Sequence, residues 1–148
     1  MKLEQLMVDT KSAWVEYPGS PGFEVQVNNL SRKELLNLRK RCTINKFDRK
    51  TRTMEEEMDD DKFIHEFTDA TIKSWKGFKL KFLEDLILVD LKTEDPESFL
   101  DFTLENAELL VTNSTEFDNW LNEVVFDLAN FRGAGEGKTG RTSREVAA

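Results

Sequence analysis

Near the start of the chain, apolar residues alternate with polar ones on both sides of a Pro/Gly-rich segment, residues 18–22. The apolar residues are Trp14, Val15 and Tyr17 before this segment, and Phe23, Val25 and Val27 after it. Alternation with a period of two around a turn predicts a β-hairpin over residues 14–27. Because a lone hairpin is marginal in water, it must pack on helices or extend a sheet in another subunit. The pattern leaves open whether the hairpin pairs within one chain or with a neighbour.

After residue 30 the apolar residues follow helical spacing. Ser31 and Glu34 have the spacing of a capping box, which predicts a helix that runs to about Cys42. Residues 43–53 are polar and are expected to form a connector. Apolar positions between Met54 and Trp75 then predict the longest helix, with Gly77 as its left-handed cap. Further helices are expected over residues 80–87, from Thr103 through Leu110, and from Ser114 or Thr115 to Phe131.

These elements predict a mainly α fold, in which the N-terminal β-hairpin packs on a bundle of about five helices. Residues 1–12 are polar and are expected to form a flexible arm. Residues 13–131 form one globular domain, with the hairpin at 14–27 and the helices within 31–131. Apolar periodicity stops after Phe131, and the Gly-rich segment 132–148 is predicted to be a disordered tail.

Charge is unevenly distributed along this acidic chain, which carries a net charge of -8 over 148 residues. Residues 32–52 hold nine bases and two acids, residues 55–61 hold six acids, and residues 84–131 hold thirteen acids and one base. The acidic balance argues against nucleic acid as the main partner. No apolar run is long enough for a membrane span or a signal peptide. A single cysteine, Cys42, fits a reducing cytoplasm. The basic segment is expected to dock on an acidic patch of the same chain or of a neighbouring copy, or to be solvated.

The segment Gly133–Thr139 looks like a phosphate-binding loop but fails its spacing. That loop needs four residues between its two glycines, and the position that should hold the first glycine is Arg132. The segment also follows a predicted helix, whereas the loop must follow a strand and open a helix. We therefore expect no nucleotide cofactor.

Other candidate chemistry is equally weak. His65 and Asp69 resemble the zinc-protease motif H-E-x-x-H, but the second histidine is missing and the chain has no other. The run 59–61 lacks calcium-loop spacing and is explained as a helix start. Cys42 falls on an apolar helix stripe and is expected to be a buried structural thiol. We therefore expect no enzyme and no metal site.

Aromatic residues are abundant, with eleven Phe, three Trp and one Tyr. Core packing is their default interpretation, but several fall in hairpin, loop or short-helix positions where they could anchor a partner. The predicted partner-binding residues are Trp14, Tyr17, Phe23, Val25, Val27, Phe78 and Phe82. The edge of the predicted N-terminal hairpin, with the first helix, is the expected contact region.

Three stretches carry a resemblance to a known family: WVEYPGSPGFEVQVNNLSRKELLNLRKRCT, IKSWKGFKLKFLEDLILVD and ENAELLVTNSTEFDNWLNEVVFDLANF. In these stretches, which span Trp14 to Phe131, the chain resembles the tail assembly chaperones of long-tailed bacteriophages. The resemblance implies an ATP-independent chaperone of the host bacterial cytoplasm. It would bind and solubilise the tape-measure protein, help recruit tail-tube subunits, and be absent from the mature virion.

The resemblance also implies a longer product made by programmed minus-one frameshifting, which would be a partner of the short form. The codons of Glu136, Gly137 and Lys138 can contain the slippery sequence G-GGA-AAG, which places a candidate frameshift site there. A homo-oligomer is a further expected assembly. The alternative function is a structural minor tail or tail-completion protein of the virion. Neither a membrane nor a nucleic acid is expected as a partner.

Overall fold

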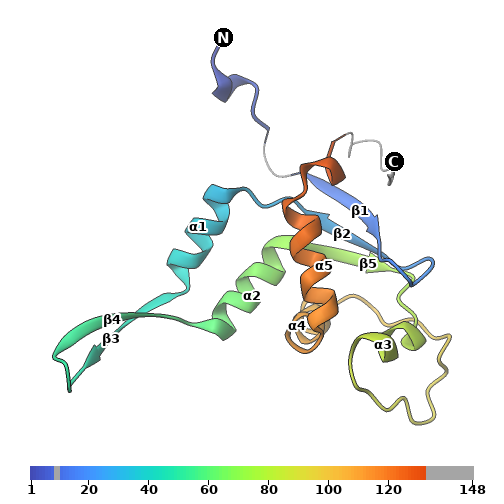
Figure 1. Cartoon of the computed structure of the whole chain (residues 1–148). Helices are drawn as coiled ribbons and strands as arrows, with labels where there is room; N and C mark the ends of the chain where they lie inside the picture. The colour runs from blue at the N-terminus through green and yellow to red at the C-terminus, as the bar shows by residue number, and fades with distance from the viewer. Residues whose placement is uncertain (9–10, 133–148) are drawn as a thin grey trace.

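The computed structural model describes residues 1–8 and 11–132, and it combines helices with two antiparallel sheets (Figure 1). In chain order the elements are η1 (Leu3–Gln5), β1 (Ser12–Glu16), β2 (Glu24–Asn28), α1 (Arg32–Arg41), β3 (Thr43–Asp48), β4 (Thr53–Met58), α2 (Asp60–Thr71), β5 (Ile72–Lys76), α3 (Leu80–Leu86), α4 (Leu104–Asn113), α5 (Thr115–Phe126) and η2 (Leu128–Asn130).

A three-stranded sheet in the order β1-β2-β5 is the base of the body, by which we mean the described elements other than η1, β3 and β4. The predicted N-terminal hairpin is confirmed, because β1 and β2 pair antiparallel with Val15 opposite Val25. The third strand, β5, comes from the same chain and pairs with β2, with Val25 opposite Trp75. Val25 and Val27 are fully buried, so one face of β2 belongs to the core. The hairpin is therefore completed within one chain, both by a third strand and by helices.

Helices α2 and α5 contact the central strand β2, and α4 packs against both helices (Figure 1). Their buried residues include Phe67 on α2, Leu110 on α4, and Phe117 and Leu121 on α5. On α5 the buried residues recur at helical spacing from Phe117 to Val125, so one face of this helix belongs to the core. Burial of such large side chains contributes roughly 1.5–3 kcal/mol each before entropy is considered.

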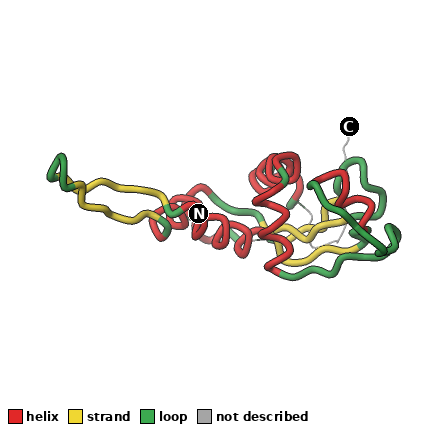
Figure 2. The backbone as a smooth tube through the Cα atoms, turned by 90° about the horizontal axis from the view of Figure 1, so that it is seen from below, coloured by secondary structure: helices red, strands yellow, loops and turns green. Residues whose placement is uncertain are grey.

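A second, two-stranded sheet projects from this body. Strands β3 and β4 form a long hairpin that leaves the end of α1 and returns at the start of α2 (Figures 1 and 2). Figure 2 shows it extending away from the remaining elements along the long direction of the molecule. We call residues 43–58 the projecting hairpin.

The predicted mainly α class is wrong, because the chain has an α+β fold with five strands in two antiparallel sheets among the described residues. The error lies in residues 43–76. The expected polar connector is β3 and its turn, and the expected long helix divides into β4, α2 and β5. Only its middle part is helical, and it begins at the cap Asp59, whose side chain accepts a hydrogen bond from the Lys62 amide.

Predicted helix starts agree with the structure more closely than predicted helix ends do. The capping box of α1 is confirmed in both directions, since Ser31 Oγ accepts from the Glu34 amide and the Glu34 carboxylate accepts from the Ser31 amide. Thr103 caps α4 and Ser114 caps α5, as predicted. The last helix, however, ends at Phe126 and is followed by the short turn η2. The predicted tail from Gly133 onward lies outside the described residues.

Gly77 has the positive φ that was expected, +70°, but it does not cap a helix. It follows strand β5, where its Cα approaches the turn of the first hairpin. A Cβ at this position would lie 2.0 Å from the carbonyl oxygen of Gly22. Glycine is therefore required both by the backbone angle and by the contact.

Candidate functional site

Six of the seven predicted partner-binding residues lie in the core. Tyr17, Phe23, Val25, Val27, Phe78 and Phe82 are all buried in the body. Only Trp14 reaches the surface, on the face of the sheet opposite the core, where Lys76 Nζ lies 4.5 Å from its ring centroid. As folded, the six core side chains expose little or no surface to a partner.

An aromatic network accounts for this burial. Phe23 and Phe78 stack with ring centroids 4.2 Å apart, and Trp75 meets Phe78 edge-on at 5.1 Å. The Trp75 indole also donates to the Leu100 carbonyl oxygen at 2.8 Å, so its polar end is satisfied. Each such ring pair adds about 0.5–1.5 kcal/mol beyond the area it buries. The turn of the first hairpin, strand β5 and the loop before α4 are thus joined through aromatic rings.

Each of the weak chemical candidates has a defined place in the structure. Cys42 is fully buried, and burial raises the pKa of its thiol, which disfavours the reactive thiolate. Asp59 caps α2, and Asp60 and Asp61 lie in its first turn. His65 lies on the exposed side of α2 and hydrogen-bonds Glu108 of α4. Among the described residues no group of three or more His, Cys, Asp or Glu is placed to hold a metal ion.

Tyr17 and Glu97 are two of the groups outside the projecting hairpin whose pKa values are shifted. Burial raises the pKa of Tyr17, and so does its hydrogen bond to Glu116, whose Oε2 accepts from the phenol at 2.9 Å. Lys79 and Lys81 each donate to Glu97 at 2.8 Å and lower the pKa of that exposed carboxyl to about 2. The shift at Tyr17 therefore arises first from burial, and the shift at Glu97 from its pairing with two lysines.

The projecting hairpin exposes its side chains to solvent, unlike the six buried residues that were predicted to bind a partner. Side chains from Ile44 to Phe47 and from Arg49 to Glu57 are all exposed. Phe47 and Met54 are directly paired across the strands and are 55% and 65% exposed. A directly opposed pair shares one face of a hairpin, so the two side chains form a single apolar patch near the tip. Exposed and paired in this way, they have the chemistry of a protein contact.

Local interactions define the tip of the projecting hairpin. Asp48 Oδ1 accepts from the Lys50 amide at 2.8 Å, and the Arg52 amide donates to the Asp48 carbonyl oxygen at 2.7 Å. Arg52 has a φ of 57°, the left-handed angle that closes the turn. On the stem, Lys46 and Glu57 form an ion pair at 2.9 Å, and Glu57 raises the pKa of Lys46. Exposed pairs of this kind contribute little to stability, because water screens both charges.

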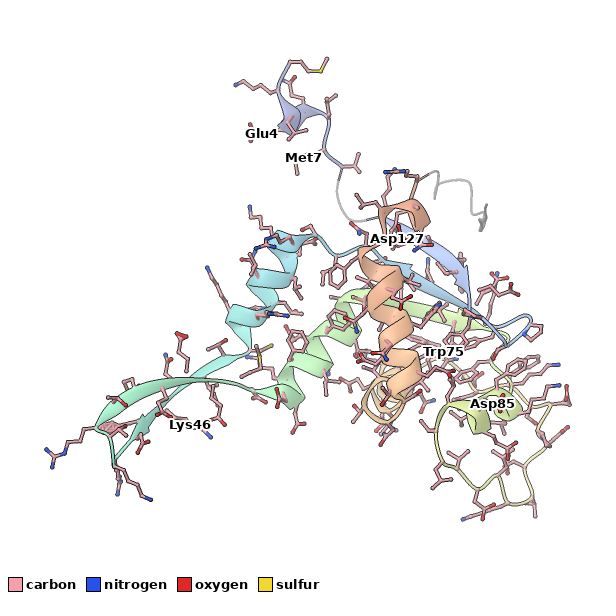
Figure 3. The ribbon with its side chains drawn as sticks, viewed as in Figure 1. Glu4, Met7, Lys46, Trp75, Asp85 and Asp127 are labelled. Atoms are coloured by element: carbon pink, nitrogen blue, oxygen red, sulfur yellow. The ribbon has the colours of Figure 1, made fainter. Side chains whose placement is uncertain are left out.

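The root of the projecting hairpin is attached firmly to the body. The Asp59 amide donates to the Cys42 carbonyl oxygen at 2.7 Å, and Thr43 Oγ1 donates to the Arg39 carbonyl oxygen at 2.8 Å. Arg41 of α1 pairs with Glu66 of α2 at 3.2 Å. Helices α1 and α2 therefore hold the two ends of the hairpin together. In Figure 3, Lys46 lies on the hairpin well away from Trp75 in the body.

Charge changes sign along the projecting hairpin. Its tip carries three bases, Arg49, Lys50 and Arg52, whereas β4 carries Glu55, Glu56 and Glu57. The run 59–61 then adds three aspartates at the root. The element therefore carries bases at its far end and acids along β4, and at its root the three aspartates meet Arg39, Lys40 and Arg41 at the end of α1.

A cleft of about 380 Å³ lies between α2 and α4, beside the root of the projecting hairpin. Ile64 and Leu109 supply its apolar surface, while Asp61, Glu105 and Glu108 supply its acids. Because His65 hydrogen-bonds Glu108, it joins the two helices across the cleft. We call this feature the α2–α4 cleft.

Sequence reasoning missed the projecting hairpin because its strands lack apolar alternation. Residues 54–58, MEEEM, also favour a helix start by their acids. Two signals pointed the other way. Thr43, Ile44 and Phe47 favour strands, and Asp48 stands at the first position of a tight turn.

Comparison of the chain with protein-family models, with curated proteins and with solved structures finds no match. No described helix has the length and apolar character needed to cross a membrane.

Proposed function

We propose that this protein is an assembly chaperone of bacteriophage tails that holds a protein client through its projecting hairpin. The client would be the tape-measure protein, which the chaperone binds and keeps soluble in the host bacterial cytoplasm. It would also help recruit tail-tube subunits, act without ATP, and be absent from the mature virion. The observation that carries the proposal is the exposed Phe47–Met54 pair on a hairpin held away from the body.

A chaperone of this kind needs apolar contacts that do not endanger its own solubility. Phe47 and Met54 offer such contacts, and Glu55, Glu56 and Glu57 follow directly on β4. Charges next to an apolar strand patch oppose self-aggregation. A client with exposed apolar helical surface gains both a cover and added negative charge. The family resemblance over Trp14–Phe131 supplies the identity of the client.

Nucleic acid is a poorer candidate for the hairpin. Its three tip bases, Arg49, Lys50 and Arg52, are followed by six acids within residues 55–61. A phosphate backbone would meet both charges along one hairpin, which weakens binding.

A structural subunit of the virion, either a minor tail or a tail-completion protein, is the second candidate. The same projecting hairpin favours it, because an extended hairpin can lock neighbouring subunits together. Mass spectrometry of purified virions separates the two proposals. A chaperone is absent from the particle, whereas a structural subunit is present.

Co-expression with the tape-measure protein tests the chaperone proposal. We expect a larger soluble fraction of the client with the native chain, and loss of that gain with Phe47→Ser/Met54→Ser. A matched control changes two exposed apolar residues of the body, Leu88→Ser/Phe99→Ser, and should retain the gain. A client that is equally insoluble with and without the protein contradicts the proposal. Equal loss with the control pair rejects the hairpin as the contact.

The longer frameshifted form, as a partner of the short one, is a separate part of the proposal. Its site would be at the codons of Gly137 and Lys138, which follow the last described element. Sequencing the gene provides the test. Codons that break the slippery heptamer, or the lack of an open minus-one frame beyond it, would reject this part alone.

A further inference from the structure

We infer that two copies of this chain form a reciprocal dimer, in which the basic hairpin tip of each copy lies in the α2–α4 cleft of the other. The inference goes beyond the proposed function and needs no client. It begins with the projecting hairpin, whose strands pair only with each other among the described strands. A two-stranded hairpin without a covering element is marginal in water, and its open edges invite a partner.

Charge complementarity identifies a second copy as the occupant. The tip presents Arg49, Lys50 and Arg52, and the cleft presents Asp61, Glu105 and Glu108. The cleft is large enough for a basic side chain, and its apolar residues Ile64 and Leu109 can receive the stem of that side chain. Arg is suited to such a site because it pairs with carboxylates while its stem covers apolar surface.

Geometry excludes the cleft of the same chain. Six paired residues on each strand separate tip from root by about 20 Å. Asp61 of the cleft lies only three residues beyond the end of β4, so the cleft is next to the root. Because the hairpin points away from the body, its tip cannot turn back to this site (Figures 1 and 2).

The same geometry suits a twofold dimer. When two hairpins lie antiparallel, the basic tip of each comes beside the acidic α2–α4 cleft at the root of the other. A twofold axis makes both contacts at once and closes the assembly. We expect dissociation in the micromolar range and a strong dependence on salt, as for small, charged interfaces.

Charge reversal on each side tests the inference by sedimentation of the full chain at low ionic strength. We expect a native dimer, and at least a tenfold weaker dimer for the tip variant R49E/K50E/R52E. The cleft variant D61K/E105K should weaken similarly, and it leaves the His65–Glu108 contact in place. An equimolar mixture of the two variants should dimerise again, because both contacts are then attractive. The control E84K/D85K, which reverses two exposed acids of α3, should dimerise like the native chain.

Each other outcome overturns the inference. A native chain that is monomeric at about 500 µM has no such dimer. A dimer that survives both reversals uses another surface. A mixture of the tip and cleft variants that stays monomeric rejects the pairing of tip with cleft. If the control variant loses dimerisation as much as the tip and cleft variants do, the loss comes from total charge and not from pairing of tip with cleft. Circular dichroism of each variant establishes that it is folded before it is scored.

Discussion

The molecule contains two β-hairpins with opposite environments. The first, β1–β2, is joined by β5 and covered by helices, so that Phe23, Val25 and Val27 are fully buried. The second, β3–β4, has no third strand among the described elements, and its Phe47 and Met54 are more than half exposed. The two hairpins therefore have the same secondary structure but differ in burial. The aromatic ring of Phe23 in the first hairpin packs in the core of the body, whereas Phe47, the aromatic residue of the second, is exposed.

The largest effect should come from the stacked pair in the body. Phe78→Ala removes a fully buried ring that stacks on Phe23 and leaves a cavity. We expect a loss of about 3–5 kcal/mol in the free energy of unfolding. Urea denaturation followed by circular dichroism measures it. A loss below about 1 kcal/mol would mean that the body is not held by these rings.

A second test concerns the close approach of Gly77 to the first hairpin. Gly77→Ala combines an unfavourable positive φ with a clash against Gly22, and we expect a loss of about 2–4 kcal/mol. Gly19→Ala is the control, because its φ of +84° is similar but nothing lies within 4 Å of its added Cβ. Equal losses for the two variants would show that only the backbone angle matters.

A smaller, pH-dependent effect is expected at Tyr17. Tyr17→Phe removes a hydrogen bond to Glu116 and should cost about 0.5–1.5 kcal/mol at neutral pH. The folded-state pKa of Tyr17 is raised, so above about pH 10 the unfolded chain loses this proton first. Stability from this group is therefore present below about pH 10 and lost as the pH rises. The free energy of unfolding, measured from pH 8 to 11, should fall less steeply with rising pH in the variant than in the native chain. If the two chains give parallel curves of unfolding free energy against pH, the pH dependence does not come from Tyr17.

The smallest effect on stability should come from the projecting hairpin. Phe47→Ala removes a ring that is 55% exposed, and we expect a change below about 0.5 kcal/mol. The same denaturation assay used for Phe78→Ala measures it. A loss as large as that of Phe78→Ala would mean that the hairpin is packed on the body, and the contrast between the two hairpins would disappear.

Local signals predicted the parts of the fold that local interactions determine. The caps Ser31, Thr103 and Ser114 satisfy amides three residues away, so a short sequence window contains their full cause. The first hairpin was predictable because alternation and a Pro/Gly turn occur together. Burial of Cys42 followed from its place on an apolar stripe.

Other features depend on distant partners and could not be predicted in this way. Residues 72–76 share helical spacing with α2, but pairing with β2 makes them a strand. Phe78 and Phe82 looked free in a short segment, yet the first hairpin and the loop before α4 enclose this region. The α2–α4 cleft joins residues more than forty positions apart, such as His65 and Glu108. Tertiary context overrides local preference in each of these cases.

The central claim is that the projecting hairpin makes the contacts of this protein without supporting its fold. The most direct test replaces residues 44–57 by the two-residue turn Asn-Gly, since Thr43 and Met58 are directly paired and such a turn can join them. We predict that the unfolding free energy changes by less than about 1 kcal/mol. If the proposed function holds, the soluble fraction of the co-expressed tape-measure protein should fall to its level without this chain. A shortened chain that fails to fold, or one that solubilises the client as well as the native chain, would contradict the account.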